Sequence, residues 1–381
     1  MGGVGGVRAL FPALKTYTYL DASARAPLAD PVRRALDAFL DDRQSGAYTK
    51  PRWFERVETA REKFARLIHA HPDEVAFTKN TSEGLNIIAQ AFPWQPGDEV
   101  LVAPDLEHPS NVYPWLNLRQ RGVAVRILQP AGPALGVENV AAHCTARTRM
   151  ISLAGVSFST GGRQDLAAIG ALCRERGIFL CVDGVQLVGF LDVDPGALGV
   201  DALSLGTNKG LLNLYGLGLL WVRRDRIEGL TPAYLSRFGV DVAGAEETLG
   251  ELDYRLLPSA RRFEVGNYNY MAIHGLDAAL DLLLGAGMEA VHAHNLRLAR
   301  RLAQGLAEAG YRVVSPTAEP YVSHVVVFEP GAHSRYKDME SLAAACERER
   351  IRMSVRRGRV RMSFHLYNSD EDVARVLEVL G

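Results

Sequence analysis

The sequence predicts an α/β protein with a large domain built on a mostly parallel sheet flanked by helices, and a smaller α+β domain at the C-terminus. Helical and strand-like patterns alternate from about residue 50 to 225, which is typical of βα units. After Pro258 this alternation stops, and long helical patterns are followed by short strands. We therefore expect an N-terminal segment over 1–20, a large domain over 21–260 and a small domain over 261–381.

Strands of the large domain are expected where short apolar runs are rich in β-branched residues. These runs are Glu99–Ala103, Ala124–Leu128, Met150–Val156, Ile178–Val182, Asp201–Leu205 and Gly218–Val222. Amphipathic patterns over Pro109–Arg121 and Asp165–Arg176 predict helices between them. The result is a mostly parallel sheet with helices on both faces.

The expected small domain begins with two long helical patterns, Ala272–Leu284 and Ala290–Ala309. The expected strands that follow are Tyr311–Val314, Val322–Phe328, Arg352–Ser354 and Val360–Phe364. Further helices are expected near Asp338–Arg348 and from Asp370 onward.

The composition and charge of the chain exclude several classes of function. The 381 residues carry a formal net charge of -1, which argues against a dedicated nucleic-acid binder. The longest apolar run, Leu211–Val222, is too short to span a bilayer, and no basic stretch followed by an apolar one opens the chain. The four cysteines lack C-x-x-C spacing, so we expect reduced thiols and no metal site. A cytoplasmic protein without a membrane or nucleic-acid partner is expected.

The chemistry is expected where two of the strands end. Asp183 directly follows an apolar strand, and in open α/β sheets ligands bind at the carboxyl ends of strands. Lys209 follows a later strand and is flanked by small residues, so it is accessible for imine formation with an aldehyde. Pyridoxal 5′-phosphate (PLP) is such an aldehyde, and a carboxylate keeps its ring nitrogen protonated so that the ring can accept electrons. Asp183 suits that role, and Gln186 is placed to reach the ring oxygen.

A third element supplies a phosphate cradle. Thr81 and Ser82 follow the strand-like Glu74–Phe77 and open a helix, where hydroxyls lie beside free backbone N–H groups. Each element alone also fits a structural role: a strand-ending aspartate can be a cap, a loop lysine can be solvated, and Thr81–Ser82 can be part of a plain N-terminal cap.

Together these motifs resemble the class V aminotransferase family of fold-type I PLP enzymes, which includes cysteine desulfurases, selenocysteine lyases and isopenicillin N epimerase-like proteins. The resemblance runs from Tyr19-Leu20-Asp21 to Tyr367-Asn368. It implies that Lys209 forms the Schiff base with PLP, Asp183 contacts the pyridinium, and Gln186 contacts O3′. It also implies that Thr81 and Ser82 bind the phosphate.

The resemblance extends to three further positions. It implies that His108, in Leu106-Glu107-His108-Pro109-Ser110-Asn111, stacks on the cofactor ring and shuttles protons. Arg361 aligns with the arginine that holds the substrate α-carboxylate, and a guanidinium suits a carboxylate. The segment ending at Asn267 resembles one that reaches a partner's phosphate, so a homodimer with shared active sites is implied. Arg357, Arg359 and Arg361 are expected on one face of a strand.

Several positions depart from the family pattern. Asn208 replaces the usual histidine before the lysine, Gly206 stands where a phosphate-binding serine often lies, and Asn267 replaces threonine. Phe158 replaces an asparagine of the desulfurases and is expected, with the unusual Arg25, to shape the substrate pocket. The phosphate site is therefore expected to use altered ligands, including Asn208 and Asn267.

The most informative departure is an absence. Cysteine desulfurases carry a nucleophilic cysteine on a loop shortly before the carboxylate-binding arginine, but no cysteine lies between Ser354 and Arg361. The reaction expected from the resemblance is β-elimination from an S-substituted cysteine, as in related C–S lyases of natural-product pathways. Aminotransferase, epimerase and decarboxylating oxidative deaminase activities remain alternatives. A PLP-free binding protein is disfavoured because Lys209 and Asp183 are present, and a nicotinamide dehydrogenase because no G-x-G-x-x-G follows a strand.

Overall fold

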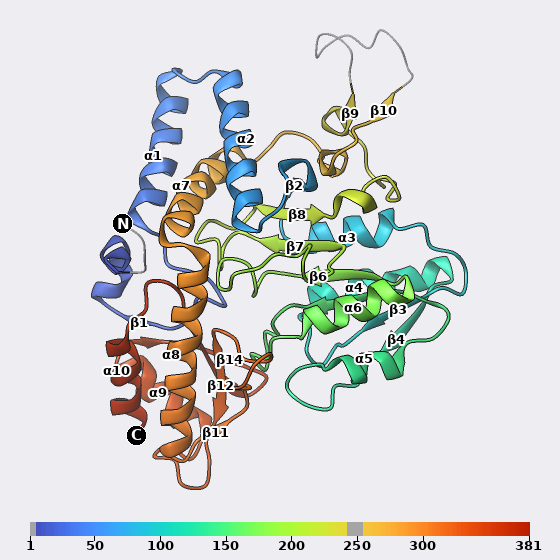
Figure 1. The fold of residues 1–381 in the computed structure, drawn as a ribbon. Helices are drawn as coiled ribbons and strands as arrows, with labels where there is room; N and C mark the ends of the chain where they lie inside the picture. Colours follow the sequence, from blue (N-terminus) through green and yellow to red (C-terminus); the bar gives the residue numbers. More distant parts are fainter. Residues whose placement is uncertain (1–4, 242–253) are drawn as a thin grey trace.

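The computed structural model describes residues 5–241 and 254–381, and over these residues a seven-stranded sheet forms the centre of the larger domain (Figure 1). The strands lie in the order β2 (Val75–Thr78), β8 (Gly218–Val222), β7 (Ala202–Gly206), β6 (Phe179–Asp183), β5 (Thr148–Ala154), β3 (Glu99–Val102) and β4 (Ala124–Ile127). Strand β8 is antiparallel to both neighbours, and the others run in one direction. The predicted mostly parallel sheet is confirmed.

Helices cover both faces of this sheet. On one face, α3 (Thr81–Ala91) and α4 (Tyr113–Asn117) share an apolar cluster with the strands. On the other, α2 (Lys50–Leu67), α5 (Val137–His143), α6 (Leu166–Arg176) and α7 (Tyr270–Ala286) share the largest cluster. Alternate residues of β6 therefore enter different clusters, Leu180 and Val182 on one side, Phe179 and Cys181 on the other. This double burial explains the uninterrupted apolar run in the sequence.

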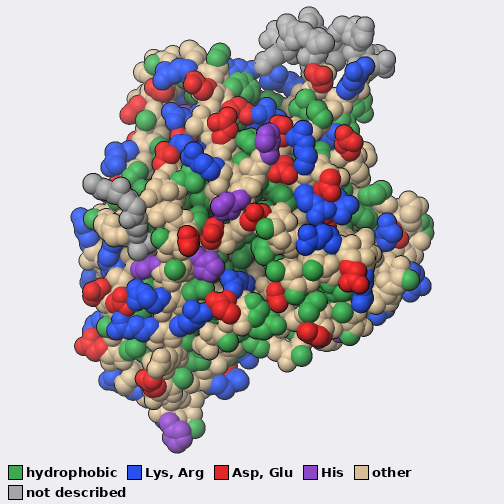
Figure 2. Space-filling model, viewed as in Figure 1, with side chains coloured by type: hydrophobic (Ala, Val, Ile, Leu, Met, Phe, Trp, Pro, Cys, Tyr) green, Lys and Arg blue, Asp and Glu red, His purple; other side chains and the backbone are tan. Residues whose placement is uncertain are grey.

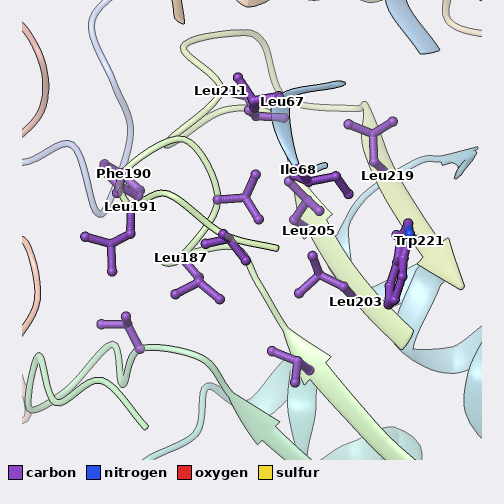
Figure 3. Close-up of a cluster of buried hydrophobic side chains, with 14 of the residues drawn as sticks. Leu67, Ile68, Leu187, Phe190, Leu191, Leu203, Leu205, Leu211, Leu219 and Trp221 are labelled. Atoms are coloured by element: carbon purple, nitrogen blue, oxygen red, sulfur yellow. The ribbon is translucent and has the colours of Figure 1, made fainter. Parts of the chain in front are cut away.

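Part of the larger cluster lies between the end of α2 and strands β7 and β8 (Figure 3). Leu203, Leu205 and Trp221 from the strands face Leu67 and Ile68 in this cluster, and all five side chains are buried. Leu211, two residues beyond Lys209, belongs to the same cluster. The loop that carries Lys209 is therefore held between the apolar core and the end of the sheet.

The smaller domain is built on a four-stranded antiparallel sheet. Its strands lie in the order β11 (Arg312–Val313), β12 (Val325–Glu329), β15 (Arg359–Ser363) and β14 (Ser354–Arg356). Helices α8 (Met288–Glu308), α9 (Met339–Arg348) and α10 (Asp370–Leu380) share its apolar cluster. Helix α8 joins the two cores, since Val291 lies in the large one and Leu302 in the small one (Figure 1).

The N-terminal segment lies against the small domain. Strand β1 (Thr18–Tyr19) pairs in parallel with β13 (Ile351–Arg352), and Arg8 forms an ion pair with Asp372 at 2.7 Å. Helix α1 (Asp30–Ser45) then packs with α2 against α7 (Figure 1). The expected domain boundaries at residues 20 and 260 stay predictions. Helix α7 follows residue 260 in the sequence, but it packs on α1 and α2, which lie before that boundary.

The prediction of one continuous helix over Pro109–Arg121 is wrong. The chain forms the short 3₁₀ turn Pro109–Asn111, then α4, then a second 3₁₀ turn over Leu118–Arg121. Pro114 has no N–H to continue a helix from Pro109, so the pattern breaks into separate turns.

Figure 2 shows acidic and basic side chains interspersed over the visible face, in keeping with the balanced formal charge. Within the described residues no single helix is long and apolar enough to cross a membrane, and only the α7–α8 pair, bent by 78°, passes on length and composition.

Candidate active site

A cavity of about 650 Å³ lies where the carboxyl ends of β6 and β7 meet the start of α3 and the β14–β15 hairpin. Predicted site residues that line it are Thr81, Ser82, His108, Phe158, Asp183, Gln186, Asn208, Lys209 and Arg361. The chain thus brings together residues that are far apart in the sequence. Their individual roles remain predictions that the geometry supports.

Asp183 and Lys209 form the electrostatic centre of the cavity. Burial raises the pKa of Asp183 to about 6, although the Val185 N–H donates to its Oδ1 at 3.0 Å and the charge of Lys209 opposes the shift. Burial lowers the pKa of Lys209 to about 8, against the opposing effect of Asp183. A lysine with this pKa is partly neutral near physiological pH, as imine formation and proton abstraction require.

A buried polar network supports the floor of the cavity beside Asp183. Glu107 accepts hydrogen bonds from the Ala154 N–H at 2.7 Å and from the Asn111 amide at 2.8 Å. The side-chain oxygen of Asn111, Oδ1, accepts hydrogen bonds from the Ser152 hydroxyl at 2.7 Å and from the Trp115 ring N–H at 3.0 Å. Burial raises the pKa of Glu107 to about 8, so this carboxyl group is protonated at neutral pH and adds no charge beside Asp183.

The opposite end of the cavity is polar and uncharged. Asn80 caps α3 by accepting from the Glu83 N–H at 2.9 Å, and Thr81 and Ser82 form the first helical turn, whose N–H groups lack intrahelical partners. A Cβ at Gly206 would lie 3.2 Å from Asn208 Oδ1 and 3.4 Å from Thr81 Oγ1, so a serine there would crowd both. The glycine therefore gives Asn208 and Thr81 room to converge.

His108 and Phe158 form one wall. Their rings meet edge to face with centroids 5.4 Å apart, and His108 Nδ1 lies 2.9 Å from the Ser110 hydroxyl. Burial, and then the charges of Lys209, Arg356 and Arg361, lower the pKa of His108. The ring is therefore neutral near pH 7 and suited to stacking.

Gln186 is tied to a residue that the sequence did not single out. Its amide donates to the Ser23 carbonyl at 2.8 Å, while its Oε1 is buried without a hydrogen-bond partner. The Ser23 hydroxyl lies 3.2 Å from His324 Nε2, and the Ser23 N–H donates to Ser363 at 2.8 Å. Ser23 therefore joins the N-terminal segment, the small domain and the cavity.

Arg361 approaches the cavity from β15. Its Nη1 donates to the Phe158 carbonyl at 3.1 Å, its Nε to the Ser354 hydroxyl at 3.2 Å, and Asp21 lies 3.8 Å from Nη2. Burial lowers the pKa of Arg361 to about 10, since Asp21 compensates only in part. A buried guanidinium with so little compensation suits a substrate carboxylate.

The β14–β15 hairpin corrects one expectation and adds two lining residues. Arg357, with φ of 48°, and Gly358, with φ of 73°, form the turn, so Arg357 does not share a strand face with Arg359 and Arg361 as expected. Arg356 and Arg357 both line the cavity. The sequence signal for this turn is a glycine-containing pair between two short alternating runs.

Two predicted residues lie outside this cavity in the single chain. Arg25 is exposed, and its carbonyl accepts from the Tyr19 hydroxyl at 3.0 Å. Asn267 is exposed at a separate hollow of about 310 Å³ with Lys79 and Glu83. The placements of Arg25 toward a substrate and of Asn267 toward a partner's phosphate stay predictions.

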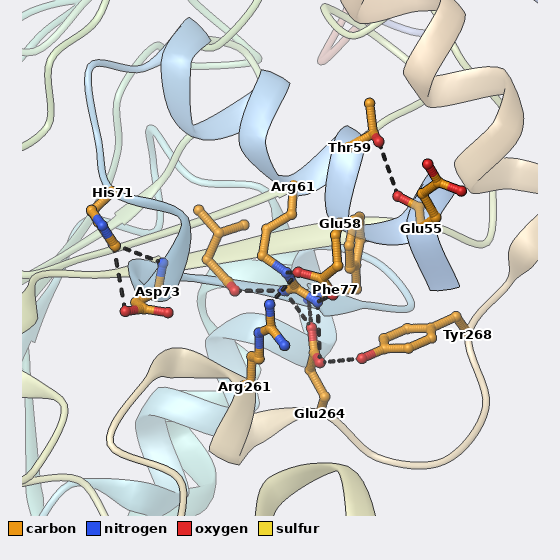
Figure 4. A network of polar contacts seen from close by, with 11 residues as sticks. Glu55, Glu58, Thr59, Arg61, His71, Asp73, Phe77, Arg261, Glu264 and Tyr268 are labelled. Atoms are coloured by element: carbon orange, nitrogen blue, oxygen red, sulfur yellow. Dashed lines mark hydrogen bonds and ion pairs between the residues drawn. The ribbon is translucent and has the colours of Figure 1, made fainter. Parts of the chain in front are cut away.

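The segment that carries Asn267 is anchored by a buried ion pair (Figure 4). Arg61 donates to Glu264 at 2.7 Å and to the Val75 carbonyl at 2.7 Å, while Glu264 also accepts from the Phe77 N–H and the Tyr268 hydroxyl at 2.8 and 2.6 Å. Each buried charge is thus fully hydrogen-bonded, which offsets its desolvation. Asn267 projects from a rigid base.

These features fit PLP. Asp183, buried and without an arginine or lysine ion pair among the described residues, suits the ring nitrogen, and Lys209, with its lowered pKa, suits the aldehyde. The N-terminus of α3, with hydroxyl and amide side chains, suits the phosphate. The buried Gln186 side chain lines the same cavity, which suits a contact with the ring oxygen.

Comparison with known proteins gives the same assignment. The family model described as Aminotransferase class-V matches residues 18–376. The chain is 30% identical over 392 residues to a probable cysteine desulfurase of Methanothermobacter thermautotrophicus, covering 98% of this chain and 96% of that protein.

Solved structures share the fold over almost the whole chain. The Escherichia coli cysteine desulfurase CsdA superposes with a TM-score of 0.83 at 25% identity, over 100% of this chain and 98% of that one. The cystine C-S lyase C-DES, in complex with cysteine persulfide, superposes with a TM-score of 0.87 at 24% identity, over 97% and 98% of the two chains. The predicted PLP-enzyme fold is thereby confirmed, and this chain belongs to the class V aminotransferase family of PLP-dependent enzymes.

Proposed function

We propose that this enzyme cleaves the C–S bond of an S-substituted cysteine by β-elimination, releasing a thiol, pyruvate and ammonia with the uptake of one water. The observation that carries the proposal is a cavity with a lysine, an aspartate and an arginine for PLP chemistry but no thiol among the lining residues that the structure describes. A sulfur atom therefore has no protein acceptor there and leaves with its substituent.

The positions of the cysteines support this interpretation. Cys173, Cys181 and Cys346 are buried, and Cys144 is half-buried. Burial raises the pKa of the Cys181 and Cys346 thiols, which keeps them protonated and poorly nucleophilic. The hairpin before Arg361 has a two-residue turn instead of a loop that could carry a nucleophile.

The residues of the chain have defined tasks in this reaction. Bound PLP supplies an aldehyde for the amine and an electron sink for the α-carbon. Arg361 holds the α-carboxylate, and Lys209 accepts the α-proton as general base. The β-C–S bond then breaks, and the thiolate leaves with the bonding electron pair. Neutral His108 lies against Phe158, where both rings exclude water from one side of the reacting carbon.

The alternatives differ in product, and no particular contact favours one of them. Transamination yields a keto acid that retains sulfur, and epimerisation only inverts the α-carbon. Decarboxylating oxidative deamination releases carbon dioxide and an S-linked aldehyde. Desulfuration, for which several relatives are named, leaves sulfur on a protein thiol, and the described lining residues include no cysteine.

The test is a product balance on purified holoenzyme with a panel of S-alkyl and S-aryl cysteines. We expect thiol and pyruvate in equal amounts from at least one of them, and none from Lys209→Ala. Alkylation of Cys144 with iodoacetamide serves as the control and is expected to leave thiol release unchanged. A sulfur-containing keto acid, or sulfur retained on the protein, would overturn the proposal.

We also propose a cytoplasmic homodimer with shared active sites. Four free cysteines suit a reducing compartment, and the exposed, rigidly anchored Asn267 suits contact with a partner's phosphate. Analytical ultracentrifugation of wild type and of Asn267→Ala, with PLP retention measured for both, tests this arrangement. A fully active monomer would contradict it.

A further inference from the structure

The β14–β15 hairpin presents more positive charge to the cavity than the α-carboxylate of a substrate requires. Arg356, Arg357 and Arg361 all line the cavity, and among the residues that the structure describes Asp183 is the only acidic one that does. Asp183 lies beside Lys209 at the sheet end, where the ring nitrogen of PLP is expected. The hairpin side therefore carries an excess of positive charge.

Three of the four arginines on this hairpin have identifiable protein partners. Arg359 binds Glu329 at 2.8 Å, and Arg357 donates to the carbonyls of Asp105 and Pro104 at 2.5 and 3.1 Å. Arg361 bonds to Phe158 and Ser354 and lies near Asp21. The contacts of Arg357 and Arg361 hold the hairpin against the large domain, and those of Arg361 direct its side chain toward the cavity.

Arg356 is different. Among the described residues its guanidinium has no carboxylate within ion-pair distance, and its one hydrogen bond goes to the neighbouring Val355 carbonyl at 2.9 Å. The side chain is half-buried at the cavity wall. Most of its N–H donors therefore remain available to a ligand, in the fork geometry that suits carboxylate, sulfonate or phosphate oxygens.

We propose that Arg356 binds an anionic group on the side chain of the substrate, so that the enzyme selects amino acids with a second negative charge. This inference rests on the proposed function, in which Arg361 takes the α-carboxylate of an amino-acid substrate. Arg356 then acts as a specificity residue for the S-substituent, since it ends β14 directly before the turn and lines the same cavity as Arg361.

Electrostatics in the cavity agree with this assignment. Burial is the main cause of the lowered pKa of Lys209, His108 and Arg361, and the charge of Arg356 lowers each pKa further, as it also lowers that of Asp21. An anion bound to Arg356 would relieve this repulsion while gaining charge-assisted hydrogen bonds. A neutral substituent of the same shape would leave the guanidinium without that partner.

The test compares two ligands that differ only in charge, S-carboxymethyl-L-cysteine and S-carbamoylmethyl-L-cysteine. Binding to holoenzyme is followed by the change in visible absorbance of the bound cofactor, before and apart from product formation. Since a charged hydrogen bond contributes about 1.5–3 kcal/mol, the acid should bind about tenfold to a hundredfold more tightly than the amide.

Arg356→Gln should abolish this preference by weakening the acid alone. The matched control is Arg359→Gln, which removes the same charge from the same hairpin at a residue paired with Glu329. It should keep the preference. PLP affinity, measured by dialysis of the holoenzyme, should be unchanged in both variants.

Equal binding of the two ligands by wild type would overturn the proposal. So would equal weakening of acid and amide by Arg356→Gln, which would assign Arg356 to the α-carboxylate, or a loss of PLP affinity, which would assign it to the cofactor. The proposed lyase activity can fail separately: a preserved charge preference with a sulfur-containing keto acid as product rejects the lyase and keeps Arg356 as the specificity residue.

Discussion

The two sides of the cavity are built in contrasting ways. On the sheet side, Asp183 and Lys209 follow strands whose residues are buried on both faces. On the hairpin side, Arg356 ends β14 and Arg357 begins the two-residue turn, and their neighbours in the chain are exposed or half-buried. Replacing an apolar residue of the sheet disturbs one of its two apolar clusters, whereas the turn can change with little effect on the core. The cofactor side is thus constrained by folding, and the substrate side is free to vary.

The hairpin is nevertheless held to the sheet side at defined points. Arg361 donates to the Phe158 carbonyl, and Arg357 to the carbonyls of Asp105 and Pro104. These bonds join the small domain to loops that follow strands of the large sheet. Changes on the sheet side should therefore abolish the chemistry, and changes on the hairpin should alter substrate binding.

The largest effect is expected for Lys209→Ala. Loss of the general base should lower turnover by about 10³-fold or more, because within the described part of the chain no other lysine lines the cavity. Borohydride reduction followed by peptide mapping should place the PLP adduct on Lys209 in wild type and in the control Lys79→Ala. An adduct on any other lysine would remove Lys209 from its role.

Asp183→Asn should come next, with turnover lowered by about 10²- to 10³-fold and PLP retained. The neutral amide preserves the shape of the side chain but no longer stabilises a protonated ring nitrogen. Stopped-flow absorbance separates cofactor binding from turnover. Near-normal turnover in this variant would show that the carboxylate is not needed there.

Arg361→Gln should act on binding more than on chemistry. We expect KM for an S-substituted cysteine to rise about tenfold to a hundredfold, with a smaller change in kcat, because a charged contact to the α-carboxylate is lost. Arg359→Gln, on the same strand but paired with Glu329, should leave KM within about twofold. Equal effects of both variants would point to general damage of the hairpin.

The smallest effect concerns stability of the cofactor-free protein. Because the folded pKa of Asp183, about 6, lies above its ordinary value of 3.8, the folded state holds a proton that the unfolded state has lost between these pH values. Its contribution is full below the unfolded pKa and is lost as pH rises through 6. At pH 7.5 the Asp183→Asn apoprotein should therefore be more stable than wild type by about 2–3 kcal/mol.

This difference should shrink as pH falls below 6, where the Asp183 carboxyl becomes protonated in wild type. Urea unfolding of both apoproteins across pH 4.5–8 measures it. A difference that does not change with pH would mean that Asp183 is not strained by burial, and the contrast between the two sides of the cavity would weaken.

The sequence by itself determined the sheet and the residues at its ends. Strands such as the one predicted over Ile178–Val182 can be recognised from the sequence, because burial on both faces of the sheet requires apolar residues at every position. The polar residues that interrupt them at strand ends, Asp183 above all, then mark the ligand edge of the sheet. The order of these motifs was enough to indicate PLP and the family.

Only the tertiary structure decided which arginines meet the cavity and which residues support it. Arg356, Arg357 and Arg359 are alike in the sequence, but the turn at Arg357–Gly358 and the pairing of Arg359 with Glu329 separate them. Ser23 likewise reaches Gln186 only because β1 pairs with β13 and brings the N-terminal segment across the molecule. Arg359 and Glu329 are 30 residues apart and Ser23 and Gln186 are 163 apart, so local patterns do not indicate these pairings, which depend on how the strands and domains pack.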